Sequence, residues 1–200
     1  MLITGIKSRP IYDRLQLFPR AHRHILAAQG SGGEAVVRLL GSTVGLGGRI
    51  DLLYSSESFS GNDLSRRLSG FDVGNAEFFP TNADLLRRLS ATLAVARIGT
   101  ALYLAGSETF IGRAMQVATE YDLRTDQVLR EHCGTFARRV VCMHCGVYNE
   151  DIVHRIFCCA GCGEPLVVRD HYSRQWAAFM GVKADAETPG IIPDNEELDT

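Results

Sequence analysis

The six cysteines of this chain all lie between positions 133 and 162 of its 200 residues. Four of them form two copies of the pattern C-x-x-C-G, Cys142 to Gly146 and Cys159 to Gly163. Each C-x-x-C turn can direct two thiolates at one ion, and the glycine that follows accepts the positive φ that such a turn needs. A disulfide framework would instead distribute its bridges through the fold. The pattern therefore predicts one metal site with four ligands: Cys142, Cys145, Cys159 and Cys162.

Four thiolates suit Zn²⁺, or iron held as in rubredoxin. We expect zinc, because a small ribbon with little core of its own gains its folding free energy from the metal. Iron is the alternative, and it would make the same site a one-electron carrier. The remaining cysteines and the nearby histidines are expected to lie outside the site: Cys133, Cys158, His144 and His154.

Ahead of the cysteines, short apolar runs alternate with stretches of helical periodicity. We expect five strands, at 24–28, 50–54, 76–79, 100–105 and about 127–131. Residues that favour the position before a helix stand between these runs: Asn62, Thr81 and Ser107. The alternation of strand and helix predicts a small α/β domain, a parallel sheet with helices on both faces.

A glycine-rich turn, Gly30-Ser31-Gly32-Gly33, follows the first expected strand and precedes a helix. Helix N-termini attract phosphate, so Gly30, Gly32 and Gly33 are candidate residues for binding a nucleotide. The motif is incomplete, because Glu34-Ala35-Val36 stands where G-x-G-x-x-G has its last glycine, and a carboxylate would repel phosphate. A tight strand-to-helix connection without a ligand is the alternative, and the favoured one.

The sequence changes character again after the second cysteine pair. The amphipathic stretch from His171 to Met180 predicts a short helix, and residue types that anchor interfaces lie in or beside it: Arg169, Tyr172, Arg174 and Trp176. From Asp185 to Thr200 there are six acidic residues and no basic one, which predicts a mobile tail or an arm that orders on a partner. The predicted organisation is an α/β domain at 1–136, a metal ribbon at 137–168, and an interface segment with an acidic tail at 169–200.

Charge and hydropathy argue against several classes of protein. A net charge of −2 is unlike that of a nucleic-acid binder, and no run of 18 apolar residues could span a membrane. The first ten residues, MLITGIKSRP, lack the apolar core of a signal peptide, which predicts a cytoplasmic location. No catalytic residue is expected, because adjacent residues such as Asp170 and His171 point to opposite faces of a strand.

The order of features over about residues 23–132 resembles the pyridine-nucleotide module of ferredoxin reductase-type flavoproteins. That family has a glycine-rich turn after the first strand and a late strand ending in Cys-Gly-Pro, where this chain has Ala105-Gly106-Ser107. The resemblance adds Gly106 to the candidate cofactor-binding residues. Ala105 replaces the family's cysteine, and only about twenty residues precede the first strand, so we expect no flavin-binding barrel. The resemblance implies a retained fold with a vestigial nucleotide site.

A second resemblance joins the two cysteine turns to the stretches 167–174 and 178–182. With the reductase-like part, this pattern is similar to the small, accessory subunit of bacterial dimethylamine monooxygenases. The resemblance implies a heme-containing complex that uses NADPH and O₂ to convert dimethylamine to methylamine and formaldehyde. It implies two partners, a heme subunit and a flavin and iron–sulfur reductase subunit, which would carry those cofactors and the active site.

Two other functions stay open at this point. One is a rubredoxin-like electron-transfer protein with a nucleotide-binding domain, and the other is a stand-alone zinc-ribbon adaptor. Visible absorbance separates iron from zinc, and co-purification with a heme protein separates a subunit from an adaptor.

Overall fold

The computed structural model describes residues 8–42 and 47–198, and it divides into two compact units. The first unit comprises Tyr12–Thr135, and the second joins the described N-terminal residues 8–11 to 136–198. Each unit is built on its own five-stranded sheet. Among the helices of the described residues, none has the length and hydropathy of a membrane span.

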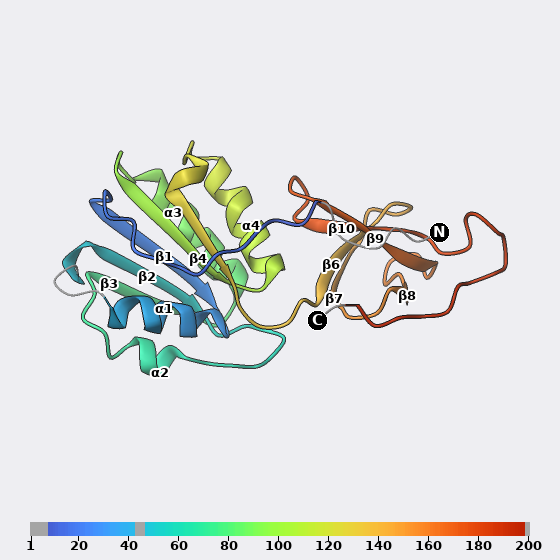
Figure 1. Ribbon diagram of the computed structural model, residues 1–200, viewed down its shortest axis with the longest axis horizontal. Coiled ribbons are helices and arrows are strands. Elements are labelled where there is room, and N and C mark those ends of the chain that lie inside the picture. The colour runs from blue at the N-terminus through green and yellow to red at the C-terminus, as the bar shows by residue number, and fades with distance from the viewer. Residues whose placement is uncertain (1–7, 43–46, 199–200) are drawn as a thin grey trace. The chain divides into compact units, whose positions relative to one another are not determined.

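The sheet of the first unit is entirely parallel, with the strand order β3-β2-β1-β4-β5 (Figure 1). Its strands are β1 (Arg23–Gln29), β2 (Ile50–Ser55), β3 (Asn75–Phe79), β4 (Thr100–Gly106) and β5 (Val128–His132). Its α-helices are α1 (Gly32–Gly41), α2 (Ser65–Leu68), α3 (Asn82–Ala94) and α4 (Glu108–Thr119). Short 3₁₀ turns precede two of the strands: η1 (Gly47–Arg49) and η2 (Thr125–Gln127). The five expected strands are confirmed, each within one residue at either end.

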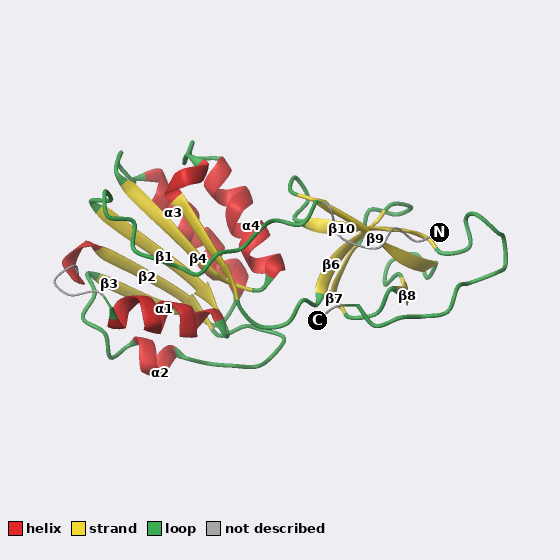
Figure 2. Cartoon of the chain, in the orientation of Figure 1, coloured by secondary structure: helices red, strands yellow, loops and turns green. Residues whose placement is uncertain are grey.

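Helices cover both faces of this sheet, as the alternation predicts (Figure 2). Helices α1 and α2 pack on one face, and α3 and α4 pack on the other. Successive side chains of a strand point to opposite faces, so β1 contributes Leu26 to the first core and Ile25 to the second. Strands β2 and β4 are buried along their whole length, which explains why they appear in the sequence as continuous apolar runs.

Two of the three expected helix caps are confirmed. The hydroxyls of Thr81 and Ser107 accept backbone N–H groups at the starts of α3 and α4. The expectation for Asn62 is wrong, because Asp63 lies one residue nearer to α2 and accepts the N–H of Ser65 at 2.9 Å. An Asx side chain does stabilise the start of this helix, but from the next position along the chain.

The second unit contains a mixed sheet with the strand order β7-β6-β10-β9-β8. Strand β10 pairs in parallel with β6, and the other pairs are antiparallel. The strands are β6 (Arg138–Cys142), β7 (Tyr148–Ile152), β8 (Ile156–Cys158), β9 (Pro165–Ser173) and β10 (Ala178–Lys183). A small core forms on one face from Val140, Val168, Tyr172, Phe179 and Leu198.

The prediction of a short helix at 171–180 is wrong. These residues form the end of β9, a turn and the start of β10, and the rings of Tyr172 and Phe179 lie 5.2 Å apart across the two strands. Pairing of the two strands with each other, and of β10 with β6, satisfies the backbone there. Tyr172 is therefore a core residue and not an interface anchor, and the expected boundary between residues 168 and 169 falls inside β9.

The expectation of a mobile or partner-ordered tail at 185–200 is wrong for residues 195–198. The N–H of Arg155 donates to the carbonyl of Glu196, and the N–H of Leu198 donates to the carbonyl of Val153, both at 2.8 Å. The side chain of Leu198 is 3% exposed and lies in the core of the unit. Backbone pairing and one buried leucine thus hold this part of the acidic segment on its own sheet.

Substitution of Gly32 by alanine is expected to destabilise the first unit. A Cβ on Gly32 would lie 2.1 Å from the carbonyl oxygen of Ala105, so α1 would have to move away from β4. Overpacking of this kind costs about 1–3 kcal/mol. Gly41→Ala is the matched control in the same helix, because nothing lies within 4 Å of its Cβ position. Urea unfolding followed by helical circular dichroism measures both, since the described α-helices all lie in the first unit; equal midpoints for the two variants would contradict the prediction.

Candidate metal centre

Each C-x-x-C-G turn begins at the end of a strand. Strand β6 ends with Cys142, and Cys159 directly follows β8. In both turns the N–H of the glycine donates to the carbonyl oxygen of the first cysteine at 2.9 Å. Gly146 and Gly163 have φ angles of 76° and 74°, a region that glycine enters without steric cost. The conformational role expected of these two glycines is confirmed.

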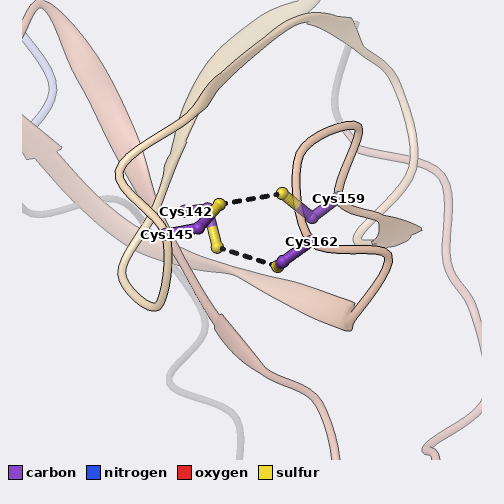
Figure 3. A group of neighbouring side chains, drawn as sticks. All are labelled: Cys142, Cys145, Cys159 and Cys162. Atoms are coloured by element: carbon purple, nitrogen blue, oxygen red, sulfur yellow. Dashed lines mark hydrogen bonds between the residues drawn. The ribbon is translucent and has the colours of Figure 1, made fainter.

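The two turns bring four cysteine sulfurs together (Figure 3). The Sγ atoms all lie within 4.8 Å of one another. The Sγ of Cys142 is 3.8 Å from that of Cys162, and the Sγ of Cys145 is 3.6 Å from that of Cys159. A tetrahedral ion with metal–sulfur bonds of about 2.3 Å has sulfur–sulfur edges of about 3.8 Å. The number, chemistry and spacing of the donors therefore fit a tetrahedral ion such as Zn²⁺, or iron.

The two sides of this cluster differ in exposure. Cys142 and Cys159, the first cysteine of each turn, are buried, whereas Cys145 is exposed and Cys162 is partly exposed. A small apolar group that includes Leu166 surrounds the buried side. The cluster thus lies at the surface of the second unit, with one pair of sulfurs inside and one pair facing outward.

Hydrogen bonds and neighbouring sulfurs shift the thiol pKa values in opposite directions. Burial disfavours the Cys159 thiolate, but hydrogen bonds from the N–H groups of Cys162 and Gly161, the Cys145 thiol and the Asn149 amide outweigh it and lower the pKa of Cys159 to about 6. The N–H of Glu164 favours the thiolate of Cys162, but burial and the other three sulfurs raise the pKa of Cys162 to about 12. The site therefore favours the thiolate of Cys159 and disfavours that of Cys162 until a cation compensates the charge.

The other cysteines and the two histidines do not belong to the cluster. Cys158 is exposed at the end of β8, and His144 and His154 are also exposed. Cys133 lies in the first unit directly after β5, where burial and the nearby Glu131 raise the pKa of its thiol to about 11.

Asn149 is a site residue that the sequence analysis missed. Its side chain lies on β7, is 6% exposed in total, and contacts both cysteine turns. The amide oxygen accepts the N–H of Ala160 at 2.8 Å, and the amide nitrogen lies 3.8 Å from the Sγ of Cys159. The only signal in the sequence is an asparagine among the residues after the first turn, a position where asparagine is also common for other reasons.

The glycine-rich turn and Gly106 lie at one edge of the parallel sheet, at the carboxyl ends of β1 and β4. Gly30 has a φ of 50°, and Gly32 packs against the end of β4 so closely that a Cβ would overlap the carbonyl group of Ala105. These glycines permit a tight turn and close contact between helix and strand. A cavity of about 530 Å³ lies elsewhere, at the amino ends of β1, β2 and β3.

Polar groups at this carboxyl edge bond to one another. The N–H groups of Gly33 and Glu34 donate to carbonyl oxygens of the turn itself, at 3.0 and 3.1 Å. The side chain of Gln29 spans the edge: its amide donates to the carbonyl of Glu57 at 2.8 Å and its oxygen accepts the N–H of Ser107 at 3.0 Å. The start of α1, where a phosphate would bind in a dinucleotide fold, thus has internal acceptors for these donors.

The chain thus has two parts. One is a parallel α/β unit with a dinucleotide-type fold, and the other is a sheet that carries a four-cysteine metal-binding cluster. The chain belongs to the family of DmmA-like dimethylamine monooxygenase subunits. The model of the N-terminal domain of that family matches residues 4–128, and the model of its C-terminal domain matches residues 139–182. The resemblance to dimethylamine monooxygenase subunits, stated from the sequence, is confirmed.

Known proteins resemble this chain to different extents. The heme-dependent oxidative N-demethylase delta subunit of Ectopseudomonas mendocina (strain ymp) is 31% identical over 191 residues, which cover 93% of this chain and 94% of that protein. An intact type IV self-sufficient cytochrome P450 monooxygenase is 19% identical with a TM-score of 0.49, and 68% of this chain covers 19% of it. Phthalate dioxygenase reductase is 15% identical with a TM-score of 0.46, and 68% of this chain covers 46% of it. The two solved structures are much longer than this chain, and similarity at this level says nothing of its function.

Replacement of Cys162 by serine is expected to abolish metal binding and to loosen the second unit, because the cluster loses one of its four soft donors. Cys158→Ser is the matched control, since Cys158 lies four residues away and outside the cluster. Elemental analysis of each purified chain gives the metal content, and the fluorescence of Trp176, the one tryptophan of the sequence, reports on the second unit. Full metal content in Cys162→Ser, or its loss in Cys158→Ser, would show that the ligand set is wrong.

Proposed function

We propose that this chain is a non-catalytic subunit of a heme-dependent complex that uses NADPH and O₂ to convert dimethylamine to methylamine and formaldehyde. The observation that carries the proposal is the alignment with the N-demethylase delta subunit, which covers 94% of that protein and so includes both units. The description of the family supports dimethylamine as the substrate. Heme, flavin and an iron–sulfur centre belong to partner subunits in this proposal. We place the complex in the cytoplasm, a reducing compartment that keeps the ligand thiols unpaired.

The metal centre is the contribution of this chain's own residues. Cys142, Cys145, Cys159 and Cys162 hold zinc, and a closed set of four thiolates leaves no open position for substrate, so the ion is structural. The ion holds the two turns at a fixed distance and thereby fixes the surface around the exposed Cys145. Arg174 and Trp176 remain accessible in the turn between β9 and β10, and they are the residues we propose for contact with a partner subunit.

Exposure of Cys145 favours a second candidate function, an electron relay with iron in the same four-cysteine site. A sulfur ligand at the surface would bring the iron close to the cofactor of a docked partner. Oxidised iron in four thiolates absorbs visible light, whereas zinc in the same site is colourless. A red chain with one iron per molecule would favour the relay over the structural zinc site.

The complex itself provides the test of the proposed subunit role. The tagged chain, purified from its native host, is expected to bring down a heme protein with a Soret band and a flavin-containing reductase. The isolated assembly is expected to oxidise NADPH and release formaldehyde when dimethylamine is added. A chain that purifies alone, from cells whose demethylase is fully active after its gene is deleted, would contradict the proposal and favour a free-standing adaptor.

The α/β unit is proposed to be a scaffold that has kept the dinucleotide fold without using it. Internal bonding of the α1 N-terminus and the span of Gln29 between Glu57 and Ser107 support this proposal. We therefore expect no binding of NADPH by the full chain in a calorimetric titration, with the flavin reductase partner as the positive control. Micromolar affinity for NADPH would contradict the scaffold role and favour a nucleotide-binding electron carrier.

A further inference from the structure

Asn149 uses every polar atom of its side chain in contacts around the four-cysteine cluster. The amide oxygen accepts the N–H of Ala160, in the second turn, at 2.8 Å. The amide nitrogen lies 3.3 and 3.4 Å from the carbonyl oxygens of Val147 and Val140, on the side of the first turn, and its two N–H groups are shared between these oxygens and a sulfur. The same nitrogen lies 3.8 Å from the Sγ of Cys159, within range of an N–H···S hydrogen bond. One buried side chain thus bonds to both turns and to one of the sulfurs.

The sheet places the two turns on either side of one strand but does not bring their sulfurs into contact. The first turn connects β6 to β7 and the second connects β8 to β9, and β7 and β8 are the two opposite edge strands of the sheet. Strands β6 and β9 both pair with β10, so backbone ladders set the two turns two strands apart, and the ion and contacts between side chains bridge the remaining separation. Asn149 supplies a direct hydrogen-bonded contact of this kind, from the edge strand β7 to the turn after β8.

We propose that Asn149 is a positioning residue for the metal centre, an inference that rests on the proposed four-cysteine site. It holds the second turn against the first through Ala160, and it donates a hydrogen bond to the thiolate of Cys159. The first action preorganises the four sulfurs at the spacing a tetrahedral ion requires. The second reduces the charge that Cys159 directs at the metal. Partners that orient and polarise metal ligands in this way typically change metal affinity 10–100-fold when they are removed.

Three variants of the full chain separate these actions from general stability. Asn149→Ala removes both contacts, whereas Asn149→Asp keeps the shape and the oxygen that accepts from Ala160 but replaces the donor to sulfur with a carboxylate oxygen. Asn195→Asp is the matched control, because the oxygen of Asn195 accepts the N–H of Ile156 at 2.9 Å in the same unit and the residue lies outside the cluster. Asn149→Asp also provides the second variant if Asn149→Ala does not fold.

Two measurements are made on each variant. Competition with a chromophoric chelator gives the zinc affinity, and the thiolate-to-cobalt charge-transfer band is recorded at saturating Co²⁺. We expect Asn149→Ala and Asn149→Asp to bind zinc about 10–100-fold more weakly than the wild type. We also expect their cobalt band to move to longer wavelength, because a thiolate that loses a hydrogen bond is a stronger electron donor. Asn195→Asp is expected to match the wild type in both measurements.

The results distinguish failure of this inference from failure of the site. If the wild type binds zinc and Asn149→Asp has the same affinity and the same cobalt band, Asn149 does not donate to the sulfur and the inference is wrong. A fall in affinity for Asn195→Asp as large as that for Asn149→Asp would also overturn it, because the effect would then be general. A wild-type chain that binds neither zinc nor cobalt overturns the proposed metal site, and this inference with it.

Discussion

Mutual repulsion of the four cysteine sulfurs is the constraint on which the second unit depends. Atoms within 4.8 Å of one another cannot all carry a negative charge unless a cation lies between them. Without the ion, the pKa of Cys159 is lowered and that of Cys162 is raised, so the thiolate of Cys159 forms more readily than that of Cys162. Binding of the metal therefore changes the charge state and fixes the positions of the two turns in a single step.

Because the two turns lie at different places in the sheet, metal binding affects the whole second unit. Cys142 ends β6, which is an inner strand, while Cys159 follows β8, a three-residue edge strand. Strand β8 pairs with β9 alone, over three residues. An ion bound to both turns would add a link between this edge strand and the interior of the sheet. The core of this unit is small, whereas the first unit buries two separate apolar layers. Loss of metal should therefore change the surface of the second unit and leave the fold of the first intact.

Local features were predictable from the sequence, and features made by distant segments were not. The strands of the first unit and the conformation of the two cysteine turns follow from short patterns that need no partner. The stretch around Tyr172 and Phe179 has helical spacing, yet pairing between β6, β9 and β10 overrides it. The acidic segment contains three large apolar residues, Ile191, Ile192 and Leu198, of which only Leu198 is buried, and its position depends on backbone pairing near Val153. Asn149 could not be found because its role requires three segments to meet.

The glycine-rich turn shows why a motif alone did not settle a function. Glycine at position 32 is required whether the helix approaches a phosphate or the end of a strand, because both need a backbone without a Cβ. Here the close neighbour is the carbonyl of Ala105, and the N–H groups of Gly33 and Glu34 already have acceptors within the turn. A phosphate would have to displace those acceptors and would meet the carboxylate of Glu34 in the first turn of the helix. Packing between α1 and β4 is therefore a sufficient reason for these glycines, and their presence does not by itself indicate a nucleotide.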